Sequence, residues 1–261
     1  MLDIDLSVFT NLKKERNIRK SQGGASYNEL FTGYDDNRPG NKVRVMGNPT
    51  IGDVKVMMLG VRNLSGEVKS GEVWVNELRL LEPDSDGGWA ASGTLKVQLS
   101  DFGYVNVTGR YVSDGFGGLE EGILQRSTDT QRNYSVTTSL ELGKFFPEKA
   151  KVSAPLYYSV TKDEVRPRYN PLDTDMRLED ALDAATGAER DSIESLAVTK
   201  TTNTNFSLSN LRWGLKTKRH PMPYDPANFS FSYSHSHNYT SGETTVYEQR
   251  DEWRGALNYS Y

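Results

Sequence analysis

The stretch Asn228 to Tyr239 reads NFSFSYSHSHNY, and its strict alternation decides the fold class. Aromatic or imidazole rings occupy every second position, and serine or asparagine occupies every position between them. Because successive side chains of a β-strand point to opposite faces, this stretch predicts a strand with rings on one face and small polar groups on the other. Two interpretations follow. His235 and His237 could belong to a metal site, or the strand could be a wall between lipid and water.

The composition fits the wall. The chain has 261 residues and a formal net charge of −4, which gives no reason to expect nucleic acid as a partner. It has no cysteine, so disulfides, thiolate metal sites and a cysteine nucleophile are excluded. The mean hydropathy is −0.65 and no run of about 18 apolar residues occurs, so no transmembrane helix is expected. A membrane β-barrel has such a polar average, because only alternate residues face lipid.

Alternation of the same kind recurs from Trp89 to the end of the chain. It predicts seven strands of about ten residues, and the turns SDFG and GKFFPEK join four of them into two hairpins. A tilted strand needs about 9 to 11 residues to cross a bilayer, whereas soluble strands average about 5 to 6. We therefore predict a segment of an antiparallel transmembrane β-barrel. The expected strands are 94–100, 104–112, 133–143, 150–160, 203–210, 228–239 and 252–261.

The phase of each strand divides its residues between lipid and a hydrated lumen, with aromatic rings near the headgroups. The residues predicted to be lipid-facing or interfacial are Tyr111, Tyr134, Tyr158, Phe206, Phe229, Phe231, Tyr233, His235, His237, Tyr239, Trp253 and Tyr259. The residues predicted to face the lumen are Lys96, Asn106, Arg110, Glu141, Lys151, Ser232 and Arg254.

The metal interpretation of His235 and His237 needs further ligands. The third histidine of the chain, His220, lies in a predicted loop one strand away, and carboxylates would have to supply the rest. Both rings are in phase with Phe229 to Tyr239, which favours an interfacial aromatic belt. We therefore expect no metal site and no cofactor.

Other candidate sites also have simpler explanations. The acidic, glycine-containing stretches YDDNRPGN (34–41) and DSDGG (84–88) lack the spacing of a calcium loop and are expected to be turns. The neighbouring carboxylates Glu120 and Glu121, and likewise Asp251 and Glu252, would point to opposite faces of a strand and so cannot act on one bond. We expect no enzymatic activity.

Two further regions have their own patterns. Residues 1–88 begin with a charged lead, LKKERNIRK, and continue with strand-like runs, DVKVMMLGVRN and GEVWVNELRLLE among them, which predict the end of a β-sandwich or jelly-roll-like domain. Residues 89–261 form the predicted barrel wall, with long external loops at 114–129 and 161–202.

The second of these loops has an internal helical pattern. Leu178, Ala181, Leu182 and Ala185 follow helical spacing, and Ile193, Leu196 and Ala197 continue it after a break at Gly187. Asp173 or Asp175 could cap the first helix. A short helical pair is therefore predicted.

Several stretches, in this order, closely resemble one family. They are GNPTIGDVKVMMLGVRN, GEVWVNELRL, GGWAASGTLKVQLSDFGYVNVTGRY, SLELGKFFPEKAKVSAPLYYS and YNPLDTDMRLEDALD. They resemble the SprA (Sov) family, the outer-membrane translocon of the type IX secretion system of Bacteroidota. The resemblance implies a very large single-chain barrel in the cell outer membrane that passes folded cargo proteins to the cell surface. It also implies accessory secretion proteins as partners and, in some relatives, a role in gliding motility.

The resemblance implies no catalytic residues. Family members are many times longer, and the N-terminus lacks the basic and apolar regions of a signal peptide, so we expect this chain to be an internal segment. Seven strands also leave an open edge, because single-chain bacterial barrels have an even strand number. Two alternatives remain: another outer-membrane barrel, such as a nutrient receptor, and a soluble glycan-binding β-sandwich of the cell surface.

Overall fold

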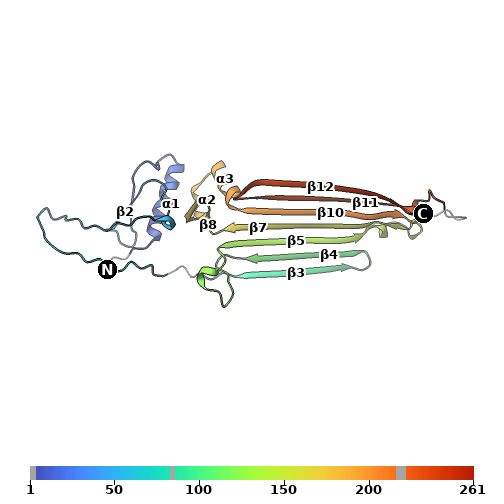
Figure 1. Ribbon diagram of the computed structural model, residues 1–261, viewed down its shortest axis with the longest axis horizontal. Helices are drawn as coiled ribbons and strands as arrows, with labels where there is room; N and C mark the ends of the chain where they lie inside the picture. The colour runs from blue at the N-terminus through green and yellow to red at the C-terminus, as the bar shows by residue number, and fades with distance from the viewer. Residues whose placement is uncertain (1–3, 83–85, 216–221) are drawn as a thin grey trace.

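One long antiparallel sheet dominates the computed structural model, which describes residues 4–82, 86–215 and 222–261. A small N-terminal unit lies beside two short helices at one end of this sheet, and the strands run along the longest axis of the molecule (Figure 1). The protein is therefore mainly β, as predicted.

The sheet follows the order β12-β11-β10-β7-β5-β4-β3, and the two-residue strand β6 (Val152–Ser153) pairs with the far end of β10. Both predicted hairpins are formed, β3 with β4 and β5 with β7. Among the described strands, β3 and β12 pair on one side only, so the sheet is open. The bounds are β3 (Ala90–Leu99), β4 (Gly103–Val112), β5 (Asp129–Glu141), β7 (Pro155–Pro167), β10 (Thr199–Trp213), β11 (Phe229–Gly242) and β12 (Thr245–Tyr259).

The strands are longer than the sequence suggested. The shortest of these seven has 10 residues and the longest have 15. At about 3.3 Å per residue they extend roughly 33 to 50 Å. Connections at the helical end are 113–128, 168–198 and the tight turn 243–244, whereas those at the other end are 100–102, 142–154 and 214–228. The two predicted long loops therefore lie at the helical end, but the third connection at that end, 243–244, is short.

Residues of the predicted loop 161–202 are mostly ordered into regular structure. After β7 come β8 (Tyr169–Asn170), β9 (Asp173–Arg177), α2 (Leu178–Ala184) and α3 (Ala188–Ala197). The predicted helical pair is present, and its apolar side chains form a small core of Leu178, Leu182, Ala197 and Val198, against which Ile193 packs. Neither Asp173 nor Asp175 caps α2, whose N-cap residue is Arg177.

The predicted strands between residues 54 and 82 are not formed. The described residues of this segment belong to no helix or strand, and Met58 and Trp74 are 89% and 88% exposed. The physical reason is that a strand needs a neighbouring strand to accept and donate its backbone hydrogen bonds. The segment instead extends away from the sheet, so it meets no such neighbour (blue-green to cyan in Figure 1). The domain division at residue 88 stays a prediction.

The charged lead forms an unpredicted helix, α1 (Ser7–Ser21), followed by the hairpin of β1 (Phe31–Tyr34) and β2 (Lys42–Val45). Ion pairs dock this helix against β9. The buried Lys13 Nζ lies 2.5 Å from Asp173 Oδ1 and 2.7 Å from Asp175 Oδ1, and it also donates a hydrogen bond to the Pro49 carbonyl. The fully buried Arg16 donates to the carbonyl of Gly47 and to the side chain of Asn48.

The two carboxylates that share Lys13 differ in acidity. Burial raises the pKa of Asp173. Burial also acts to raise the pKa of Asp175, but hydrogen bonds from Lys13 and from the Ile51 amide outweigh it and hold that pKa below its ordinary value. Asp175 therefore stays ionised to a lower pH than Asp173 does. Its contribution to docking is present at neutral pH and is lost as the pH falls through its lowered pKa.

Replacing Lys13 with methionine should weaken the docking of α1 by about 3 to 5 kcal/mol, because two buried carboxylates would face each other without a counterion. Hydrogen exchange at the amides of α1 measures this loss. Lys14→Met is the matched control, since Lys14 pairs with Asp180 at side-chain exposures of 34% and 35% and such pairs contribute at most about 1 kcal/mol. Equal exchange rates in the two variants would contradict the assignment.

Candidate membrane interface

Pairing across the sheet gathers the apolar side chains onto one face, because residues directly opposite each other on antiparallel strands point the same way. We call this the apolar face. Ladders such as Val97, Val105, Thr138, Tyr158, Phe206, His235 and Trp253 cross all seven strands. The predicted lipid-facing or interfacial residues share this face: Tyr111, Tyr134, Tyr158, Phe206, Phe229, Phe231, Tyr233, His235, His237, Tyr239, Trp253 and Tyr259.

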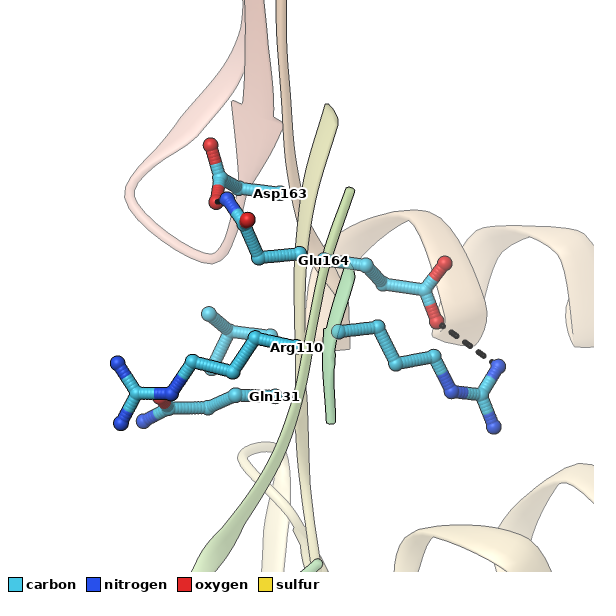
Figure 2. A pocket seen from close by; sticks show the side chains of 7 residues that line it. Arg110, Gln131, Asp163 and Glu164 are labelled. Carbon is cyan, nitrogen blue, oxygen red and sulfur yellow. Dashed lines mark hydrogen bonds and ion pairs between the residues drawn. The ribbon is translucent and has the colours of Figure 1, made fainter. Parts of the chain in front are cut away.

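The opposite, polar face consists largely of small uncharged groups. One ladder across it reads Lys96, Asn106, Thr137, Ser159, Asn205, Ser236 and Glu252. Figure 2 shows Arg110, Gln131 and Asp163 on one side of the sheet and Glu164 on the other. Of the residues predicted to face a lumen, Lys96, Asn106, Arg110, Glu141, Ser232 and Arg254 lie on this face.

Lys151 was placed wrongly by the sequence pattern. It lies outside the strands, in a left-handed conformation with φ of 47° that ends the turn Glu148–Ala150 before β6. The reason is that the segment 150–160 is not one continuous strand but a turn, β6 and then β7. Glu141 is on the polar face but its carboxylate serves the same turn, where it accepts hydrogen bonds from the amides of Gly143 and Ala154.

The apolar face carries a band of apolar side chains whose boundary steps from strand to strand. On β4 the band reaches Tyr111, but the residue opposite on β5 is already charged, Arg132. On β5 the band ends at Tyr134, and the residue opposite on β7 is Lys162. Each step to the next strand therefore moves the boundary by two residues along the strand.

The step continues onto β10 and then levels out. On β7 the band ends at Val160, opposite Thr204 of β10. On β10 it ends at Phe206, which is in the same ladder as His235 and Trp253. From Trp89, just before β3, to Trp253 of β12 the boundary shifts by about eight residues. At a strand spacing of about 4.8 Å, this tilts the boundary by about 40° from the perpendicular to the strands.

Both boundaries of the band are marked by rings. Trp89 stacks on Tyr111 with ring centroids 4.5 Å apart, and His235 stacks on Trp253 at 5.2 Å. Towards the other end, the rings of Phe229 and Tyr259 are 5.1 Å apart. Rows of aromatic rings on either side of an apolar band are typical of membrane β-barrels.

The band is not covered by any other part of the described chain. Leu257, Trp253 and Leu95 are 70%, 63% and 62% exposed, and Trp253 and Leu95 lie in the middle of their strands. The hydrophobic cluster of buried residues lies instead at the helical end of the sheet. A layer of sheet with an exposed apolar face needs a second layer or another apolar environment to be stable.

His235 lies at the boundary of this band, and His237 lies two residues beyond it on the same face. His237 Nδ1 is 2.7 Å from Asp251 Oδ1, a carboxylate that faces the same side from β12. Within residues 4–82, 86–215 and 222–261, no group of three or more histidine, cysteine or acidic side chains is arranged to hold a metal ion. His220, the remaining histidine, lies outside the described residues, as does part of the stretch 84–88.

The sequence interpretation missed a charged row on the apolar face, beyond the boundary at the helical end. It consists of Arg132, Lys162, Glu164, Arg166 and Lys200, and Glu194 of α3 joins it. A signal was present, because Lys162, Glu164 and Arg166 continue the phase of Tyr158 and Val160.

A family model described as motility related/secretion protein, SprA_N, matches residues 1–182. The chain belongs to the SprA_N family. The match runs from α1 through most of α2, so it includes the strands β3 to β7, and the sheet continues without interruption into β10 to β12 of this SprA_N chain. Among curated proteins, no significant match is found. In the part of the chain that the structure describes, no helix is long and apolar enough to span a membrane.

Proposed function

We propose that this SprA_N chain forms part of the wall of an outer-membrane β-barrel that translocates secreted proteins to the cell surface. The slanted apolar band is the observation that carries the proposal. Strands of membrane barrels are tilted by about 35 to 45° from the barrel axis, so a band that lies level in the bilayer must cross the strands obliquely. The slant of about 40° on this sheet fits that requirement. Membership of a motility and secretion family supports the export role.

The polar face suits a lumen through which proteins move. Its middle carries serine, threonine and asparagine side chains, such as Thr137, Ser159 and Asn205, which form hydrogen bonds with water and carry no charge. Such a wall keeps the channel hydrated and offers a passing protein few strong ion pairs. Secreted proteins and accessory secretion proteins are the proposed partners, together with lipid on the opposite face, and no catalytic residue or cofactor is assigned.

A barrel wall also requires that β3 and β12 pair with further strands, because unpaired backbone groups are not tolerated in lipid. A soluble glycan-binding sandwich would instead need a second sheet over the apolar face. Within the described residues no such sheet lies over Leu95, Trp253 or Leu257, which are exposed. No feature of these residues favours a nutrient receptor over a protein translocon, and the family favours the translocon.

Arginine substitutions at neighbouring positions of β11 test the orientation of the sheet in lipid. Phe231→Arg should lower the free energy of unfolding in bilayers by about 2 to 4 kcal/mol, because a cation would enter the hydrocarbon near the midplane. Ser232→Arg is the matched control on the polar face and should have a much smaller effect. Denaturant unfolding of the full-length protein in lipid vesicles measures both. Equal losses would contradict the assignment of the two faces.

Site-specific photocrosslinking tests translocation. A photoreactive side chain at Asn205, in the middle of the polar face, should crosslink to proteins in transit when the full-length protein is secreting. The same group at Phe206, its neighbour on the apolar face, should crosslink to lipid only. Mass spectrometry of the adducts identifies the captured molecules. Secretion that continues normally while Asn205 captures no secreted protein would contradict the proposal.

A further inference from the structure

The charged row beyond the apolar band has an excess of positive charge. Four cations, Arg132, Lys162, Arg166 and Lys200, share two carboxylates, Glu164 and Glu194. We call the four cations the basic row. With all six groups ionised, the row carries two more positive charges than negative ones.

Each carboxylate is shared between two cations, and three of the four contacts are too long for a hydrogen bond. Glu164 Oε1 lies 3.7 Å from Arg132 Nη1 and 3.9 Å from Arg166 Nε. Glu194 Oε1 lies 3.2 Å from Arg166 Nη2 and 3.7 Å from Lys200 Nζ. Within the described part of the chain, no carboxylate lies within ion-pair distance of Lys162. Several of the donors are therefore free to bind another anion.

The basic row lies next to the aromatic rings at the boundary of the band. Lys162 Nζ lies 5.9 Å from the centroid of the Tyr134 ring, and the guanidinium carbon of Arg132 lies at the same distance from the Tyr111 ring. Cations that extend past interfacial rings reach the depth of the lipid headgroups. The side chains of Arg132 and Lys200 are 55% and 46% exposed, so a headgroup has access to them.

We propose that the basic row binds the phosphate groups of lipid A in the outer leaflet of the outer membrane. This inference rests on the proposed function, because it requires the apolar band to lie in a membrane, and on the predicted external position of the loops 114–129 and 161–202 at the helical end. The four cations come from three adjacent strands, β5, β7 and β10, and so extend over about 10 Å, wider than one phosphate group. A lipid headgroup with two separated phosphates matches this extent and the positive excess. Arginine contributes paired donors to one phosphate and lysine a point charge to another.

Charge-neutralising substitutions on the two faces test the inference. The full-length protein is placed in phosphatidylcholine vesicles that contain either lipid A or phosphatidylglycerol, and the lipids that remain bound after extraction are counted by mass spectrometry. The wild type should be enriched in lipid A over phosphatidylglycerol. The triple variant Arg132→Gln, Lys162→Gln, Lys200→Gln should lose this enrichment by about tenfold to a hundredfold.

Two controls keep the result interpretable. Lys96→Gln, Arg110→Gln, Arg254→Gln removes the same charge from the polar face and should keep the enrichment. Lys162→Gln alone breaks no ion pair, so a partial loss in this variant excludes misfolding as the cause. Equal enrichment of lipid A and phosphatidylglycerol, or equal loss in both triple variants, would overturn the lipid A site. Failure of the wild type to float with pure phosphatidylcholine vesicles would overturn the proposed function itself.

Discussion

The structure depends on what covers the apolar face of its long sheet. Backbone hydrogen bonds hold the seven strands together, but they leave large side chains such as Trp253 and Leu95 exposed in mid-strand. Burial of apolar area contributes about 25 cal/mol per Å² to the free energy of folding. In water this face would stay unburied, so the sheet would lack that stabilisation. The small core around Leu178 and Val198 is at the end of the sheet and does not cover this face. In the barrel wall that we propose, lipid covers the apolar face and the polar face is left for water.

The register of the strand pairs determines which side chains lie on the apolar face. A shift of one residue between two strands would move every ring of one strand to the polar face, so each pairing must be specified. The turn 100–102 and the connection 142–154 set the register of the two hairpins. A bulge on β10 between Leu208 and Leu211 changes the phase, so that Leu211 stays opposite Phe231 and its neighbour Arg212 points to the polar face beside Ser153. The irregularity therefore preserves the band.

Local patterns predicted the sheet because they depend on neighbours in sequence. Alternation gave the seven strands and their shared faces, and helical spacing gave α2 and α3. Long-range ion pairs have no such signature: α1 docks through Lys13 to Asp173 and Asp175, about 160 residues away. The segment 54–82 shows the converse, since strand-like residues form no strand where no partner lies beside them. Likewise, the contact of Asp251 with His237 depends on the pairing of β11 with β12, which neither segment shows alone.

The slant of the apolar band is the central claim, and cysteine scanning measures it most directly. The chain has no cysteine, so single cysteines can be introduced without background and labelled with a nitroxide in the full-length protein in bilayers. Oxygen collides preferentially with labels in lipid, and a water-soluble nickel complex with labels in water. We predict that the lipid-exposed boundary on the apolar face moves from Trp89, just before β3, through Tyr134 on β5 and Val160 on β7, to Trp253 on β12. A boundary that crosses all strands at the same ladder, or equal nickel accessibility on both faces, would contradict the account.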